Sequence, residues 1–236
     1  MKALRKNFLT TSAIAAAFLF MLAFTPRQAL QAADDELPEF THDGLQRVIN
    51  SRAAYGYIKP DTDFSGYDRI MILDCYVAFK KDWKKEFNRS NRSLTQRITD
   101  KDMERMKNDM AEAFREVFVA ELTENDGYEL ADAPADDVLL IRPAIIDLDA
   151  HAPDTQPAGR SYTFVDSAGA ATLYIELYDS VSGEILARAI DRKADRGHGR
   201  MEWSSGPKNR AAARRVLRQW AGWLRERMDE VRGTTD

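Results

Sequence analysis

The stretch ELYDSVSGEILARAIDR, residues 176–192, decides the fold, because it places two alternating apolar runs on either side of a turn. If residues 181–183 form a three-residue loop, Gly183 takes the left-handed conformation that such loops require. Glu176 then lies opposite Arg188, and the pairs on the other face are apolar. The same register pairs Tyr178 with Leu186, Tyr174 with Ile190, Thr172 with Arg192, Leu177 with Ala187 and Ile175 with Ala189. The stretch therefore predicts a β-hairpin whose charges are most simply explained as cross-strand pairs.

Two earlier runs are apolar on both faces, which is typical of strands inside a sheet. One is RIMILDCYVAF, residues 69–79, and the other covers residues 138–146, where Pro143 indicates a bulge or an edge position. Between them, methionine, phenylalanine and valine recur at helical spacing from Met103 to Leu122. Strand, helix and strand in this order favour a right-handed crossover between two parallel strands.

Two helices have recognisable starts. Thr99 and Asp102 form a capping box before the first helix. The last helix begins at Ser205 or Gly206, and Pro207 suits its first turn. The complete order is strand, helix, strand, strand, strand, helix. We therefore predict an α/β (α+β) fold with a mixed four-stranded sheet and helices packed on it.

The N-terminus has the pattern of a secretory signal peptide. Lys2, Arg5 and Lys6 precede an apolar run that is shorter than the about 20 residues of a membrane-spanning helix. Small residues follow and end near Ala32, the expected cleavage site. We expect three parts, which are a signal peptide over 1–32, an extended leader over 33–66 and a single α/β domain over 67–236.

Charge and cysteine content narrow the class of protein further. The chain has 34 Lys and Arg against 38 Asp and Glu, and removal of residues 1–32 leaves 30 against 38. Cys75 is the only cysteine, so it has no partner for a disulfide, and it lies far beyond the site where a lipid-anchored protein carries its cysteine. We expect a periplasmic protein with no nucleic-acid partner, no transmembrane span and no lipid anchor of its own.

A group of possible metal ligands follows the second strand. Asp147, Asp149 and His151 alternate in DLDAH, so their side chains project from one face of the strand end. Two carboxylates and an imidazole can ligate a divalent metal. The alternative is a polar strand end exposed to solvent.

A second candidate site is the loop RGHGR before the last helix. Arg196, His198 and Arg200 combine with backbone N–H groups to suit a phosphate or a carboxylate, and the alternative is a flexible polar loop. Ser205 and Lys208 match the Ser-x-x-Lys pattern of penicillin-interacting serine enzymes, but the companion motifs are missing, so we interpret the match as a helix cap. We assign no catalytic residue and no cofactor.

Basic residues gather in two segments. Residues 80–99 form a long basic connection without predicted secondary structure, which contains Trp83, Lys84 and Lys85. The last helix aligns a stripe of arginines, Arg210, Arg214, Arg218, Arg225 and Arg232. In an exported protein this surface would bind an anionic envelope component or an envelope protein. The alternative is a solvated helix face whose arginine stems cover apolar surface.

Several stretches resemble a known bacterial family. They are YIKPDTDFSGYDRIMILD (57–74), DDVLLIRPAIIDL (136–148) and AGAATLYIELYDSVSGEILARAIDR (168–192), together with the closing arginine and tryptophan helix. They are similar to the family of domain of unknown function 3313. The resemblance implies an exported, often lipid-anchored envelope protein of Gram-negative bacteria with no assigned activity. This sequence departs from the lipoprotein members because no cysteine follows its signal peptide.

Two functional hypotheses follow. The first is a non-catalytic binding or scaffolding module in the periplasm, with a basic surface for an anionic or protein partner. The alternative is a small periplasmic hydrolase or metal-dependent enzyme that uses the strand end with Asp147, Asp149 and His151.

Overall fold

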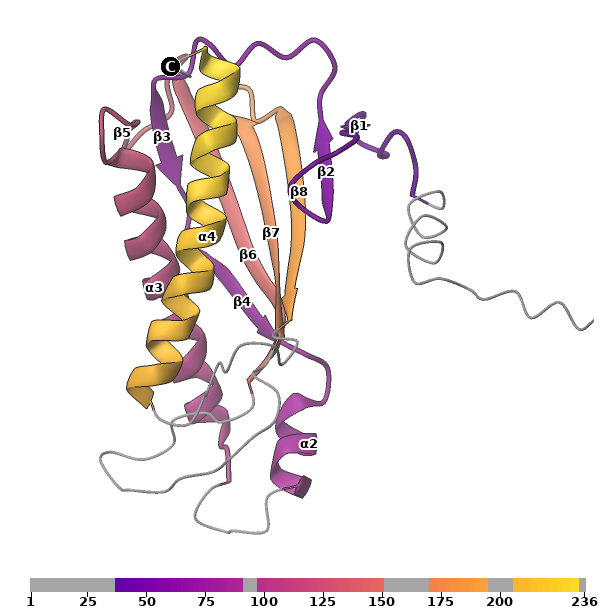
Figure 1. The fold of residues 1–236 in the computed structure, drawn as a ribbon, viewed down its shortest axis with the longest axis vertical. Helices are drawn as coiled ribbons and strands as arrows, with labels where there is room; N and C mark the ends of the chain where they lie inside the picture. The colour runs from indigo at the N-terminus through magenta and orange to yellow at the C-terminus, as the bar shows by residue number, and fades with distance from the viewer. Residues whose placement is uncertain (1–36, 91–96, 151–169, 195–205, 234–236) are drawn as a thin grey trace, which may run out of the picture. The chain divides into compact units, whose positions relative to one another are not determined.

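The computed structural model describes residues 37–90, 97–150, 170–194 and 206–233 (Figure 1). The described residues from Glu39 onward belong to one compact unit. Their elements in chain order are β1 (Gln46–Arg47), β2 (Tyr55–Ile58), β3 (Arg69–Ile72), β4 (Tyr76–Phe79), α2 (Trp83–Ser90), α3 (Asp100–Thr123), β5 (Glu129–Leu130), β6 (Val138–Asp149), β7 (Ala170–Asp179), β8 (Ile185–Ala194) and α4 (Gly206–Arg232).

The strands form one mixed sheet that α3 and α4 cover on one face (Figure 1). Its order is β1-β2-β8-β7-β6-β3-β5, and β4 pairs with β6 beyond the end of β3. The long strand β6 is antiparallel to β7 and parallel to β3 and β4. The predicted α+β class and the parallel pair are confirmed. The predicted four strands are too few, because the described residues contain eight.

The run predicted as one strand over 69–79 is divided into β3 and β4. Ile72 pairs with Ile141, but Tyr76 pairs with Ala144, so this side of the ladder holds one residue more than β6 does. An extra residue interrupts pairing in the manner of a β-bulge. Pro143 lies in β6 at this interruption, where its missing N–H costs no ladder hydrogen bond. The predicted edge position is wrong, because β6 lies inside the sheet, and the extra residue lies opposite Pro143, between β3 and β4.

The other additional strands are short. β2 comes from the segment that we predicted as a leader, and it pairs antiparallel with β8. A Cβ added at Gly56 would lie 2.6 Å from the Ser51 hydroxyl oxygen, so the glycine lets the preceding loop lie against β2. β1 and β5 contain two residues each, which is too few for a hydrophobic pattern to show.

The hairpin has the predicted register along most of its length. Glu176 pairs with Arg188, and the other predicted pairs from Leu177 towards Thr172 are also present. Tyr178 pairs with Ile185 instead of Leu186, because a bulge shifts the register beside the turn. Gly183 has a φ of 68°, as its left-handed role requires.

The helices bury their apolar stripes against the covered face of the sheet. The capping box at the start of α3 is confirmed, since the Thr99 hydroxyl accepts from the Asp102 N–H and the Asp102 carboxylate accepts from the Thr99 N–H. The buried residues of the two helices include Phe114, Val117, Phe118 and Leu122 of α3 and Leu217, Trp220, Leu224 and Met228 of α4. No helix in the described ranges has both the length and the hydropathy of a membrane span.

Candidate functional site

The basic segment after β4 contains a helix that the sequence analysis did not predict. Residues 83–90 form α2, so the prediction of a connection without secondary structure was wrong there. Trp83 is 4% exposed, and its indole N–H donates to the carbonyl of Ala150 at 3.1 Å. Its ring stacks between Phe79 and Phe87 with centroids 4.4 and 5.5 Å away. Trp83 therefore anchors α2 to the end of β4, and it does not lie on the surface as a partner contact would.

The lysines around α2 and Arg89 divide into paired and unpaired groups. Lys84 pairs with Asp100 at 2.5 Å, and Lys80 lies 3.8 Å from Asp149. Lys81, Lys85 and Arg89 are exposed, and none has an ion pair within the described ranges. Lys85 and Arg89 are one helical turn apart on α2. We call these three residues the α2 basic surface.

The arginines of α4 do not act as one surface stripe. Arg214 pairs with Glu116 of α3 at 2.5 Å, and this hydrogen bond holds the pKa of Glu116 below its ordinary value. Arg232 stacks on the ring of Tyr128 at 4.5 Å. Arg218 is exposed, and Arg210 lies near the start of α4, where side chains are outside the described part.

Arg225 is a structural residue of the fold. Its guanidinium donates to the carbonyls of Leu122 at 3.1 Å and Glu124 at 3.0 Å, which lie at the C-terminal end of α3, where carbonyls lack partners within the helix. It also pairs with Asp229 at 2.6 Å. A Cβ at Gly127 would collide with the guanidinium, so the glycine leaves room for it. Arg225 therefore caps α3 and is not available as a partner contact.

The predicted metal and anion ligands are only partly described. Asp147 has a φ of 51° and lies where the pairing of β6 with β7 shifts register, between Ile146 and Asp149. Asp149 lies beside Lys80. His151, Arg196, His198 and Arg200 lie outside the described residues, as does Ser205. Among the described residues, no three histidine, cysteine or acidic side chains cluster in a way that could hold a metal ion.

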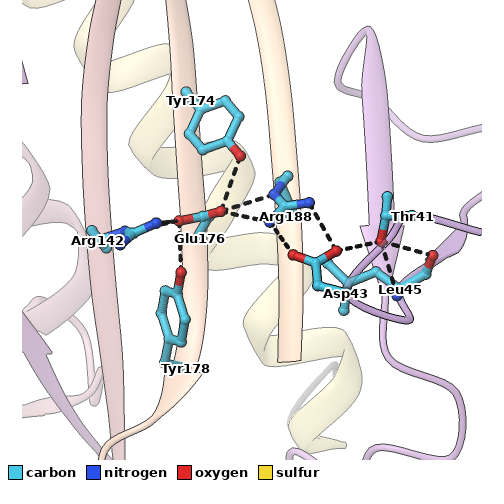
Figure 2. A network of polar contacts seen from close by, with 8 residues as sticks. All are labelled: Thr41, Asp43, Leu45, Arg142, Tyr174, Glu176, Tyr178 and Arg188. Carbon is cyan, nitrogen blue, oxygen red and sulfur yellow. Dashed lines mark hydrogen bonds and ion pairs between the residues drawn. The ribbon is translucent and has the colours of Figure 1, made fainter. Parts of the chain in front are cut away.

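A buried charge network lies on the face of the sheet away from α4 (Figure 2). Its centre is Glu176, whose side chain is 1% exposed. Four side chains donate hydrogen bonds to this carboxylate. They are Arg142 at 2.8 Å, Arg188 at 2.9 Å, the Tyr174 hydroxyl at 3.0 Å and the Tyr178 hydroxyl at 2.8 Å. Burial raises the pKa of Glu176, but these hydrogen bonds outweigh burial and hold its pKa below the ordinary value. The carboxylate is ionised and fully occupied, so it is not free to act as a base.

The network continues into the N-terminal segment (Figure 2). Arg188 pairs with Asp43, and the Thr41 hydroxyl donates to Asp43 at 2.5 Å. The Leu45 N–H in turn donates to the Thr41 hydroxyl at 3.0 Å. Hydrogen bonds from Arg188 and Thr41 hold the pKa of Asp43 well below its usual range. The segment before β1 is thereby fixed to the sheet.

The sequence analysis found only one pair of this network. Alternation predicted that Glu176 faces Arg188, and the structure confirms it. The tyrosines at 174 and 178 share a face with Glu176, so their period of two was an available signal. Arg142 could not be found in this way, because its place depends on β6 being the neighbour of β7.

Fold and site define the class as an α+β protein with two helices on one face of a mixed sheet and a closed charge network on the other. The family resemblance is confirmed by a family model that matches residues 38–224. The chain belongs to the DUF3313 family, whose description is protein of unknown function. No curated protein is detectably similar in sequence.

Solved structures give distant likenesses. PelC from Paraburkholderia phytofirmans, a dodecamer, is 10% identical with a TM-score of 0.34, and 67% of this chain and 89% of PelC are covered. Protein XCC0632 from Xanthomonas campestris is 14% identical with a TM-score of 0.37, covering 72% and 89%. A PDZ domain protein from Parabacteroides distasonis is 12% identical with a TM-score of 0.38, covering 72% and 34%. Likeness at this level carries no conclusion about function.

Proposed function

We propose that the protein is an exported, non-catalytic binding module of the bacterial cell envelope that recognises an anionic partner through the α2 basic surface. Export is supported by Lys2, Arg5 and Lys6 before the apolar run and by the small residues that end near Ala32. The mature protein is then periplasmic and acidic overall, so a local cluster of cations is an asymmetry of the surface.

One observation carries the proposal. Lys81, Lys85 and Arg89 are exposed cations without ion pairs among the described residues; Lys81 lies just before α2 and the other two lie on it, and Trp83 fixes this helix to the sheet. Because the helix is already fixed, its charges can bind a partner without the loss of backbone conformational entropy that ordering a loose segment would cost. Lysine and arginine at such a place attract phosphate and carboxylate groups over distances near the Debye length.

The test is recovery of partners from envelope extract by the mature protein. Charge reversal in the double variant Lys85→Glu with Arg89→Glu should reduce recovery of the specific partners, and added salt should reduce recovery by the unchanged protein in the same way. Partners are identified by mass spectrometry and lipid analysis.

A matched variant separates this surface from overall charge. Arg215→Glu with Arg218→Glu changes two exposed cations of α4 by the same amount. We expect this variant to recover partners as the unchanged protein does. Equal losses in the two double variants would indicate nonspecific charge attraction, and unchanged recovery by the α2 variant would refute the proposal.

A further inference from the structure

A cavity lies on the helix-covered side of the sheet, between the C-terminal half of α4 and strands β2, β7 and β8. Its volume is about 260 Å³, and it is partly open to solvent. An apolar cavity of roughly 150 Å³ is already enough to take up benzene. The side chains around it are mainly apolar and include Phe64, Leu177, Ala189, Trp223, Leu224 and Met228.

Small residues on two neighbouring strands create this space. Gly56 pairs with Ala189, and Ile58 pairs with Ala187, so a glycine and two alanines face α4 within one part of the sheet. On the neighbouring strand β7, Leu173 lies beyond the cavity and fills the core at 1% exposure. The missing side-chain volume beside α4 thus leaves a cavity where the rest of the covered face is closely packed.

The cavity presents no unpaired charge. Three arginines contribute to its lining, Arg52, Arg188 and Arg227. Arg52 pairs with Glu226 and Arg227 pairs with Glu230, whereas the guanidinium of Arg188 pairs with Glu176 on the opposite face of the sheet. A charged group of a ligand would therefore find no unpaired counter-charge in the lining, whereas a hydrocarbon group needs only the apolar walls.

We propose that this cavity binds the hydrocarbon chain of a small amphiphile, a fatty acid or an acyl lipid, whose polar head stays outside. The volume exceeds that of a single aromatic ring, and the partial opening lets a chain enter while its head remains in water. Ile49 adds apolar surface to the lining at 78% exposure. This site is separate from the α2 basic surface and does not depend on it.

The test uses cis-parinaric acid, a fatty acid whose fluorescence rises in apolar surroundings, with the mature full chain. We expect a saturable rise in fluorescence that lauric acid or a lysophospholipid reverses by competition. Displacement by lauric acid alone identifies a free fatty acid, displacement by the lysophospholipid alone identifies an acyl lipid, and displacement by both shows recognition of the chain itself. Absence of a saturable rise refutes the proposal.

Variants locate the binding in the cavity. Ala189→Leu fills the space and should weaken binding by about tenfold or more, because several methylene groups of the ligand lose their place. Because this variant could alter the fold, Ile49→Asp provides a second test at an exposed position, with Val181→Asp, 60% exposed in the hairpin loop, as its control. Ile49→Asp should weaken binding and Val181→Asp should not. Equal binding by all variants refutes the site.

These results are independent of the anionic-partner proposal. The double variant Lys85→Glu with Arg89→Glu should bind cis-parinaric acid as the unchanged protein does. A loss of fatty-acid binding in that variant would mean that the basic helix, and not the cavity, holds the amphiphile.

Discussion

Alternate residues of β7 and β8 point to opposite faces of the sheet, and one face lines an apolar cavity while the other holds a buried charge network. Ile175 and Leu177 face α4 and line the cavity, whereas Glu176 between them lies in the charge network. On the covered face, small residues leave apolar space unfilled. On the other face no described helix covers the sheet, yet Glu176 is as buried as a core residue.

The burial of Glu176 on the face without a covering helix shows that the helices alone do not decide which residues of the sheet are buried. Glu176 is shielded by the stems and rings of its own partners, since Arg142 lies 5.1 Å from the ring centroid of Tyr178 and Arg188 lies 5.8 Å from that of Tyr174. The Glu176 carboxylate is closed off because two arginines and two tyrosine hydroxyls donate to it. The apolar face remains partly open because hydrocarbon surface has no such directional requirement.

The largest expected effect is at the centre of the network. Glu176→Gln should lower the free energy of unfolding by about 3 kcal/mol, because it leaves the nearly buried Arg188 without this buried counter-charge. Glutamine keeps the shape of the side chain but turns one accepting oxygen into an N–H donor, so the loss reports the charge and the lost hydrogen bonds together. Urea unfolding followed by circular dichroism measures it.

A surface ion pair between the hairpin turn and the residue after β2 is the control for this variant. Glu184 pairs with Lys59 at 2.5 Å, and both side chains are exposed. Glu184→Gln should change stability by less than about 0.5 kcal/mol. Similar losses in the two variants would show that the network is worth no more than an ordinary surface ion pair.

Alkaline pH should weaken the polar face before it affects the apolar one. Burial and the hydrogen bond to Glu176 raise the pKa of Tyr174 and of Tyr178 from 10.0 to about 12. A raised pKa in the folded state means that the contribution to stability is complete below pH 10 and is lost as pH rises towards 12. Absorbance titration of tyrosinate should therefore show late ionisation whose amplitude falls in the double variant Tyr174→Phe with Tyr178→Phe, and the part that remains belongs to Tyr67, whose pKa burial and Asp179 also raise to about 12. Ordinary titration of the unchanged protein would contradict the closed network.

The attachment of the N-terminal segment should have a smaller effect. Asp43→Asn removes a charge that pairs with Arg188 but leaves Glu176 in place, so we expect a loss of about 1 kcal/mol. The segment before β1 should also become more sensitive to limited proteolysis. If the cleavage rate at residues 39–47 does not change, the ion pair does not hold this segment.

The sequence predicts best what neighbouring residues decide. The hairpin was predictable because Gly183 and the alternation around it are local, and α3 was predictable because its cap and its apolar stripe are local. Strand β2 was missed because its four residues show no strand pattern of their own and form a strand by pairing with β8. The same limit hid the cavity, since Gly56 and Ala189 are ordinary small residues until pairing brings them together.

The candidate site follows the same rule. The charge of residues 80–99 was evident, but their helix was missed because Trp83 finds its stacking partner Phe79 and its acceptor Ala150 only in the fold. The arginine spacing in α4 predicted one stripe, because spacing cannot show that Arg225 meets carbonyl groups about a hundred residues earlier in the chain. Partners distant in sequence thus decide which cations remain available.

The smallest expected effect tests whether the covered face has a cavity in solution. Ala189→Leu adds a side chain to the cavity lining, so its apolar surface can be buried without displacing neighbours, and stability should change by less than about 1 kcal/mol. Ala221 of α4 is 0% exposed, and the same substitution there should cost about 1–3 kcal/mol because the closed core must move. Urea unfolding of the two variants compares equal additions of volume on one face of the sheet. Equal costs would mean that the space beside Ala189 is filled, and the contrast between an open apolar face and a closed polar one would then fail on its apolar side.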